Sequence, residues 1–551
     1  MSDEPVPPLR RFRERVTARI APHFWWPAWA IALVVFIAYL ALSLARWHRM
    51  SSPSWDLAIF EEAIKGYAHF GAPIVDIKGV GFNQLGDHFS PLLVIIAPFY
   101  ALFPSAVTLL VAQCALVAIS IIPIAGLARR RLGAPAGAML GAAYGISWGL
   151  QSGVDVQFHE YCIAVPILAF GLTALVDGRW RSAAIWTVLL LGVKEDLGFN
   201  VLVIGLIMVG GGFFRRRRLR ARMGAAESSD PERFDGDDAD TEVSDVERHD
   251  ADSAMVDATD ADALADAERQ FKIGAIVTAI GVVAPLLILF VIVPSFSPDG
   301  QWQYWQRLDG ENNTTVGMSQ RGVEILTTIP ALLASLLTPA SKVVTLVMCG
   351  AVTIGSAAVS WLTLIALPTL LWRFISPNEG YWGTTWHYSL ILMPILFAAM
   401  IDALSKFRVS LSPAVRRYGR LVPPLALAFG LISCASYPLG DLVKPETYAD
   451  NPRAQEAEAV MALMPAGTSV AADTGLITYL VADHTVYWIG PLDDGVVPDF
   501  VVIDPTVGWS SDPGDPAQLA EGYYPGADFE TIYSTAQSGD ATSYRLAQHI
   551  D

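Results

Sequence analysis

Short polar sets rich in carboxylates and histidines interrupt a chain that is otherwise strongly apolar. The first lies in the segment 54–91, directly after the opening apolar run, and the others lie at the ends of later apolar runs. The candidate residues are Asp56, Asp87, His88, His159, Glu160, Lys194, Glu195, Asp196, Glu379 and His387. Ionisable groups beside a bilayer cost free energy unless they are paired or hydrated, so such sets commonly serve a function. A carboxylate can act as a general base, and lysine or histidine can hold a phosphate group.

The first polar set also has a purely structural explanation. Asp56 stands near the start of the helical pattern WDLAIFEEAI, where a carboxylate interacts favourably with the helix dipole. Asp87 and His88 precede FSP and could cap the helix that follows. Both explanations therefore stay open for this set.

The later sets leave similar alternatives. His159 and Glu160 are adjacent and would point apart on a helix, which argues against joint metal binding. Lys194 lies with two carboxylates inside an apolar stretch, where the charges form either a structural ion pair or part of a hydrated site. His387 stands between Trp386 and Tyr388, a position that also suits a residue at the membrane interface.

The composition is that of an integral membrane protein. Hydrophobic residues make up 53% of the 551 residues and charged residues 17%, and the mean hydropathy is +0.41. Many apolar runs reach the roughly 20 residues that a helix needs to cross a bilayer. The Arg-rich segment 1–26 precedes a run of this length without a small-residue cleavage site, so we expect an anchor and not a cleavable signal.

Charge is distributed unevenly along the chain. The formal net charge is −17, but acidic residues concentrate in the segments 224–270 and 440–551, and the remainder is basic. The segment 224–270 is rich in Asp, Ala and Ser and is predicted to be a disordered cytoplasmic loop. Neither acidic segment carries a basic patch, so no nucleic-acid partner is expected.

The positions of arginine and lysine predict the topology. If the N-terminus is cytoplasmic, and if 89–103 is an interfacial or re-entrant segment, the basic clusters fall on the inside and the polar sets on the outside. About eleven spans result, although 323–375 holds either two or three helices. The expected location is the bacterial plasma membrane, with the C-terminus extracytoplasmic.

The tail has lost the membrane composition. The stretches GTSVAAD, HTVYWIG and DFVVID resemble short buried strands, and 454–463 resembles a helix, which predicts a small α/β domain. The fold class is therefore a mainly α polytopic bundle with an extracytoplasmic α/β domain. The predicted units are a cytoplasmic N-terminus 1–26, a first transmembrane block 27–223 with an outer loop 47–90, the acidic loop 224–270, a second block 271–439 and the tail domain 440–551.

A helical bundle could bring the outer polar sets around one cavity, where an enzyme acting on a lipid-linked substrate would place its site. A polyprenyl-phosphate sugar needs cations for its phosphate and a carboxylate to activate the acceptor hydroxyl. Asp56 suits the second task, and Lys194 with His159 or His387 suits the first. No outer loop of the predicted bundle contains a DxD pair, so no metal or other cofactor is expected.

The ordered motifs SWDLAIFEEAI, FNQLGDHFSP, DVQFHE, LLGVKEDLG, VAADTGLITYL and PDFVVID resemble the DUF2079 family of uncharacterised bacterial membrane proteins. The resemblance covers nearly the whole chain apart from the acidic loop. The layout is similar to that of the GT-C glycosyltransferases, which use lipid-phosphate sugar donors and a catalytic Asp in the first outer loop. The resemblance places that role at Asp56, with Asp87 second, although the paired-acid motif of many members is missing.

The leading hypothesis is a glycosyltransferase that moves a sugar from a polyprenyl-phosphate donor to an envelope glycan, lipid or protein. Asp56 would be the base, and Asp87 and His88 would shape the acceptor site. The remaining residues of the sets would hold the donor. Two alternatives are a transporter or flippase with ionisable groups on broken helices, and a non-catalytic envelope-assembly protein whose outer domain binds a partner.

Overall fold

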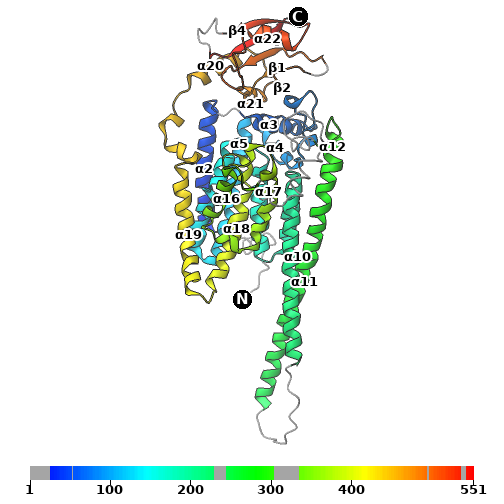
Figure 1. Ribbon diagram of the computed structural model, residues 1–551, viewed down its shortest axis with the longest axis vertical. Coiled ribbons are helices and arrows are strands. Elements are labelled where there is room, and N and C mark those ends of the chain that lie inside the picture. Colours follow the sequence, from blue (N-terminus) through cyan, green and yellow to red (C-terminus); the bar gives the residue numbers. More distant parts are fainter. Residues whose placement is uncertain are drawn as a thin grey trace, which may run out of the picture.

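The computed structural model describes residues 25–51, 54–228, 243–302, 334, 336–492, 495–534 and 542–550. Most of these residues form a bundle of helices, and a small sheet follows near the C-terminus (Figure 1). The Arg-rich segment 1–24 and the first part of the ambiguous stretch 323–375 lie outside the described residues.

Long apolar helices dominate the bundle. Among the described residues, five helices are long and apolar enough to cross a membrane: Trp26–His48, Ala106–Leu132, Leu197–Gly224, Asp260–Phe296 and His387–Arg408. Three shorter apolar helices cover Tyr161–Val176, Ala340–Val352 and Trp361–Ile375. The chain is therefore a membrane protein of the mainly helical class, while the figure of eleven crossings stays a prediction.

The helices of the bundle are joined by short 3₁₀ segments. The α-helices are α2 (Trp26–His48), α3 (Trp55–Ala68), α4 (Ala97–Leu102), α5 (Ala106–Leu132), α6 (Ala134–Gly145), α7 (Trp148–Asp155), α8 (Tyr161–Val176), α9 (Trp180–Leu189), α10 (Leu197–Ser228), α11 (Val243–Leu287), α12 (Val293–Phe296), α16 (Ala340–Val352), α17 (Leu367–Ile375), α18 (Leu392–Arg408) and α19 (Pro413–Cys434). The short segments are η1 (Asp76–Lys78), η2 (Gln84–Gly86), η3 (Pro91–Ile95), η4 (Leu190–Gly192), η6 (Ser356–Val359), η7 (Trp361–Ala366), η8 (Glu379–Tyr381), η9 (His387–Ser389), η10 (Pro438–Val443) and η11 (Pro445–Thr447), with a π-helical turn η5 (Ile288–Ile292). In the segment 89–103, which the sequence predicts to be interfacial or re-entrant, η3 and α4 are both too short to cross a bilayer.

Helices α10 and α11 lie side by side and project beyond one end of the bundle (Figure 1). Glycines bring their backbones together: a Cβ at Gly205 would lie 2.5 Å from the Thr278 nitrogen, and one at Gly281 would lie 2.5 Å from the Leu202 nitrogen. Small residues permit such close packing of apolar helices.

The acidic segment 224–270 was predicted to be disordered, but its second half belongs to helix α11. Residues 243–270 are helical, in keeping with their many alanines, which have the highest helix propensity. Residues 229–242 lie outside the part of the chain that the structure describes.

Basic side chains gather at the end of the bundle away from the sheet. Arg408 at the end of α18 donates a hydrogen bond to the Arg131 carbonyl oxygen at the end of α5 (2.7 Å). Arg130 pairs with Asp177, which follows α8 (2.7 Å). The sheet and α3 lie at the opposite end (Figure 1).

The C-terminal region contains a five-stranded mixed sheet. Its order is β2-β1-β3-β5-β4; β1 pairs with β2 and β3 in parallel, and β5 pairs with β3 and β4 antiparallel. The strands are β1 (Ser469–Ala472), β2 (Thr485–Trp488), β3 (Phe500–Ile503), β4 (Asp528–Tyr533) and β5 (Arg545–Ile550), with helices α20 (Pro452–Met461), α21 (Ile477–Leu480) and α22 (Pro516–Tyr523). The three strands and the helix predicted from the sequence are present, whereas β4 and β5 were not foreseen, since both carry several polar residues.

Alternate residues of each strand face opposite sides of this sheet. Val470 and Val502 belong to the large core that continues into the bundle, whereas Ala471 and Val501 pack with α22 in a separate small core. This alternation follows from the two-residue period of a strand. The central strands β1 and β3 are therefore buried on both faces.

The C-terminal domain rests on α3 and on the end of α2. Trp488 of β2 meets the Trp55 ring edge to face, with ring centroids 4.6 Å apart. Lys65 of α3 donates hydrogen bonds to the carbonyl oxygens of Val481 (2.6 Å) and His484 (3.0 Å). The domain thus contacts the helix that carries Asp56 in its first turn.

Candidate active site at the end of the helix bundle

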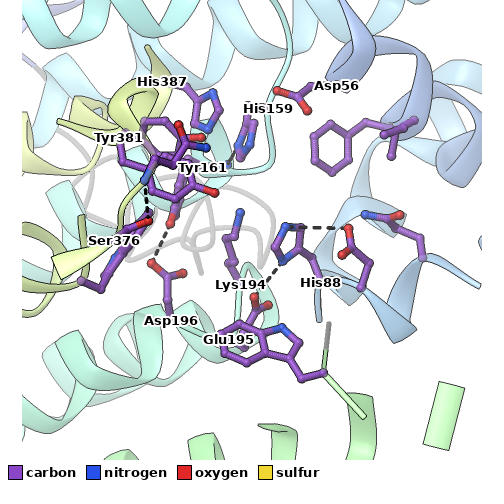
Figure 2. Close-up of a pocket in the computed structure, with 18 of the residues that line it drawn as sticks. Asp56, His88, His159, Tyr161, Lys194, Glu195, Asp196, Ser376, Tyr381 and His387 are labelled. Atoms are coloured by element: carbon purple, nitrogen blue, oxygen red, sulfur yellow. Dashed lines mark hydrogen bonds and ion pairs between the residues drawn. The ribbon is translucent and has the colours of Figure 1, made fainter. Parts of the chain in front are cut away.

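A cavity of about 580 Å³ lies at the end of the bundle nearest the C-terminal domain. Eight of the ten candidate residues line it: Asp56, Asp87, His88, His159, Lys194, Glu195, Asp196 and His387. They come from α3, from the segment between η2 and η3, from the loops before α8 and α10, and from η9, and Figure 2 labels all of them except Asp87. Polar sets that are far apart in the sequence therefore meet around one space.

The other two candidates lie elsewhere. Glu160 is fully buried behind the wall of the cavity, where it contacts two of the lining residues. Glu379 is exposed in η8 and does not line the cavity, although its neighbours Asn378 and Tyr381 do. The structure therefore leaves Glu379 without a place in the site.

Asp56 lines the cavity, and a neighbouring residue caps its helix. The Ser54 side chain accepts a hydrogen bond from the Leu57 backbone N–H (3.2 Å) and so caps α3. A serine in this position satisfies a backbone donor that the helix itself leaves unpaired. Capping therefore does not require Asp56, which lies beside His159 in Figure 2.

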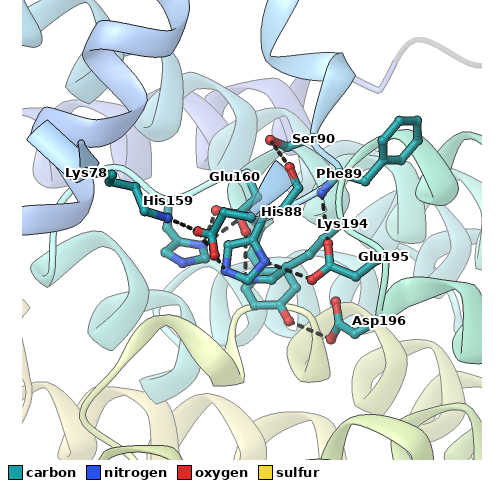
Figure 3. Close-up of polar contacts among 11 residues, drawn as sticks. Lys78, His88, Phe89, Ser90, His159, Glu160, Lys194, Glu195 and Asp196 are labelled. Carbon is teal, nitrogen blue, oxygen red and sulfur yellow. Dashed lines mark hydrogen bonds and ion pairs between the residues drawn. The ribbon is translucent and has the colours of Figure 1, made fainter. Parts of the chain in front are cut away.

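A chain of charged groups links the loop after α3 to the segment before α10. Lys78 pairs with Asp87, and His88 Nδ1 lies 2.8 Å from a carboxylate oxygen of Glu195, whose other oxygen accepts from the Phe89 N–H (3.0 Å) (Figure 3). Burial would raise the pKa of Asp87, but the charges of His88 and Lys78 outweigh it and hold that pKa below its usual value. Asp87 is therefore ionised at neutral pH.

His88 is held between two carboxylates. Burial and the charge of Lys194 lower its pKa, but Asp87 and Glu195 act more strongly in the opposite direction, so the net shift of the His88 pKa is upward. The raised pKa favours the imidazolium form, in which both ring nitrogens donate. His88 is thus a cationic link between Asp87 and Glu195 at the cavity wall.

Glu160 holds two residues of the wall in place. One carboxylate oxygen lies 2.7 Å from Lys194 Nζ, and the other lies 2.8 Å from His159 Nδ1. Lys194 also lies over the Tyr161 ring, 4.8 Å from its centroid. Burial would raise the pKa of Glu160, but His159 and Lys194 lower it well below its usual value. The buried carboxylate therefore stays charged and fixes both partners.

Asp196 also lines the cavity and accepts a hydrogen bond from the Tyr161 hydroxyl (2.6 Å). Burial raises its pKa from 3.8 to about 6, although Lys194 partly opposes the shift. Between pH 3.8 and about pH 6, Asp196 keeps its proton in the folded state but has lost it in the unfolded state. This group's contribution to stability therefore falls as the pH rises towards 6.

Replacing Asp196 by Asn should remove the pH dependence of stability that Asp196 causes, because Asn does not titrate, and it keeps an acceptor for the Tyr161 hydroxyl. The melting temperature of Asp196→Asn relative to the unmodified protein is expected to be higher at about pH 8 than at about pH 5. Thermal unfolding in detergent at both pH values measures the difference, with the exposed Asp528→Asn as the control. A difference that does not change with pH would show that Asp196 is charged throughout this range.

The loop 376–388 forms another wall and is held by a buried arginine. The Arg373 guanidinium, in α17, donates to the carbonyl oxygens of Tyr381 (2.7 Å) and Gly383 (2.8 Å) and to the Ser389 hydroxyl (3.3 Å). Five donors in a rigid fork suit several acceptors at once. Arg373 thereby positions the loop that carries His387.

Asp56, His159 and His387 form a compact group of ligand-type side chains. One potential donor atom from each lies within 4.8 Å of the others. The two imidazole rings stack, with centroids 3.4 Å apart and planes 21° from parallel. A carboxylate and two imidazoles are a donor set that can hold a divalent cation.

Several residues of the site were missed by the sequence analysis. Lys78 is the partner of Asp87, Tyr161 is the partner of Asp196, and Arg373 anchors the loop 376–388. Lys78 is one of two lysines, with Lys65, in the otherwise acidic segment 54–91, which was a signal for it. Tyr161 and Arg373 lie within or beside apolar runs and have no comparable signal.

Comparison with known proteins identifies a family. A family model described as "Predicted membrane protein (DUF2079)" matches residues 46–521. No curated protein matches the chain.

Solved structures with some similarity include two kinds of transferase. ArnT from Cupriavidus metallidurans bound to undecaprenyl phosphate has 14% sequence identity and a TM-score of 0.46, covering 96% of this chain and 98% of that chain. The oligosaccharyltransferase of Archaeoglobus fulgidus has 14% identity and a TM-score of 0.39 in its apo form, covering 91% and 73%. Its complex with Zn and sulfate has 15% identity and a TM-score of 0.41, covering 91% and 72%. TM-scores below 0.5 establish neither the fold nor the activity of this chain.

Proposed function

This chain belongs to the DUF2079 family of predicted membrane proteins, and on that premise we propose that it is a membrane glycosyltransferase. It transfers a sugar from a polyprenyl-phosphate donor, at the outer face of the plasma membrane, to an envelope glycan, lipid or protein. The substrates are thus a membrane lipid carrying the sugar and an acceptor hydroxyl.

One observation carries the proposal: a single cavity combines carboxylates, cationic side chains and an apolar wall. Asp56 lines it together with Lys78 and Lys194, and Phe199 and Leu289 line it from the candidate spans α10 and α11–α12. Phosphate, sugar hydroxyls and an isoprenoid chain need these three kinds of surface. Such a combination is not required to pack a helical bundle.

The residues suggest an order of events. The acceptor oxygen attacks the anomeric carbon while Asp56 takes the proton from that oxygen, and the bond between the anomeric carbon and the phosphate oxygen breaks. The polyprenyl phosphate leaves with the bonding electron pair, and Lys194 stabilises the charge that develops on it. Asp87, which pairs with Lys78, and His88 shape the acceptor site.

Two further carboxylates hold the cationic side chains of the site in place. Glu160 fixes Lys194 and His159, and Glu195 fixes His88. Holding the cations before the substrate arrives is favourable, because no reorganisation is then needed during the reaction. These carboxylates are therefore positioning residues.

A reconstituted assay tests the proposal. The purified full chain is placed in proteoliposomes with a panel of synthetic polyprenyl-phosphate sugars, and the release of polyprenyl phosphate is measured. Release from at least one donor, dependent on an added acceptor fraction, is the expected result. Movement of the lipid between leaflets without cleavage would instead establish a flippase, and neither activity would leave an envelope-assembly role.

A further inference from the structure

The cavity contains a donor set that the transfer chemistry above uses only in part. Asp56 comes from α3, His159 from the loop before α8, and His387 from η9. One ligand-type atom of each lies within 4.8 Å of the others, and all three line the cavity (Figure 2). Three elements that are more than 100 residues apart in sequence have therefore converged on one point.

His387 lacks the partners that a buried imidazole normally has. Its side chain is only 3% exposed, and neither ring nitrogen has a hydrogen-bond partner among the described residues. A buried polar group without a partner costs about 1–3 kcal/mol. Burying His387 beside Asp56 and His159 is therefore costly unless a ligand completes the site.

His159 has the environment of a metal-binding histidine. Its Nδ1 lies 2.8 Å from the Glu160 carboxylate, which Lys194 holds in turn from the other side (2.7 Å). Ligand histidines commonly point one ring nitrogen at a carboxylate, which fixes the ring and makes the other nitrogen a better donor. Here that arrangement leaves Nε2 of His159 as the nitrogen that can bind a metal ion.

The charge of the cavity also calls for a cation. Carboxylates outnumber the cationic side chains on its wall: Asp56, Asp87, Glu195 and Asp196 stand against Lys78, Lys194 and, when protonated, His88. Glu160, immediately behind, adds a further negative charge next to Lys194. An anionic phosphate entering this cavity would meet net repulsion unless another positive charge were present.

We propose that Asp56, His159 and His387 bind a divalent first-row transition metal, such as Zn²⁺ or Mn²⁺. One carboxylate and two imidazoles favour these ions over Ca²⁺ or Mg²⁺, and three protein ligands leave a coordination position open. The role of the ion rests on the glycosyl transfer proposed above: the open position receives a phosphate oxygen of the donor. The ion supplies the positive charge that the wall lacks.

Two adjustments accompany binding. The stacked His387 ring must turn so that a nitrogen faces the ion, and no hydrogen bond within the described chain opposes this turn. Asp56 has two carboxylate oxygens, so one can bind the ion while the other faces the acceptor hydroxyl. The missing DxD pair, which suggested a metal-independent site, is thus replaced by ligands from three separate segments of the chain.

Metal binding is measured without any substrate. The purified full chain is stripped with a chelator and titrated with Zn²⁺ and with Mn²⁺ by calorimetry, and bound metal is counted by mass spectrometry after dialysis. We expect one ion per chain, with affinity at least about tenfold weaker in His387→Gln and in His159→Gln. Glu160→Gln should weaken binding by about 10–100-fold through His159. The exposed His69→Gln is the matched control and should bind as the unmodified chain does.

A spectroscopic readout needs no variant. Co²⁺ bound to the unmodified chain should show the visible absorption of a site with nitrogen ligands, whereas the spectrum of hydrated Co²⁺ would contradict the proposal. Equal binding by the unmodified chain and both folded histidine variants would also overturn it. If the metal-stripped chain still transfers sugar in the presence of chelator, the metal proposal is refuted and the glycosyltransferase proposal stands. If the chain binds one metal ion but transfers sugar from no donor, the metal proposal stands and the glycosyltransferase proposal is refuted.

Discussion

Replacing Asp56 by Asn is expected to reduce the rate of sugar transfer by about 10²–10⁴-fold, the contribution typical of a general base. Asn has the size of Asp but cannot take a proton from the acceptor hydroxyl. The fold should persist, because Ser54 and not Asp56 caps α3. The turnover number for the best donor, measured with the purified variant, is the decisive quantity.

Two controls accompany this measurement. Asp528→Asn makes the same chemical change at an exposed position of β4 and should leave transfer unchanged. Since Asn at position 56 would also weaken the proposed metal site, the assay is repeated with saturating Zn²⁺ and Mn²⁺. Normal transfer by a folded Asp56→Asn variant would remove the base assignment.

Replacing Lys194 by Met is expected to destabilise the protein by about 3–5 kcal/mol, because it leaves the Glu160 carboxylate buried without its lysine. Glu160 is fully buried, and Lys194 is only 7% exposed. Transfer should be lost as well, since Lys194 faces the donor phosphate in the proposed mechanism. A single substitution therefore cannot separate the structural role from the functional one.

The double variant Glu160→Gln/Lys194→Met separates the two roles. It removes both charges, so much of the lost stability should return, while transfer should stay low. Unfolding of the two single variants and the double variant in detergent completes a double-mutant cycle, in which residues in contact give non-additive effects. Additive effects on stability, or a Lys194→Met variant as stable as the unmodified chain, would show that the pair is not coupled.

Local patterns were enough to predict the class of the protein and many of its elements. The apolar runs, the two acidic segments, and β1, β2, β3 and α20 all follow from composition or from periodicity over a few residues. These properties depend on neighbours along the chain, so one sequence contains them. The polar sets could be located for the same reason, although their roles stay predictions.

The folded arrangement alone shows which polar residues share a cavity. Glu160 and His159 are adjacent in the chain, yet one is buried behind the wall and the other lines it. Glu379 lies eight residues from His387 but is exposed outside the cavity. Contacts such as Lys194 with Glu160, or Trp488 with Trp55, depend on how helices and sheet pack over distances of 34 to 433 residues along the chain. Packing of this kind is a collective property of the whole chain, which no local pattern encodes.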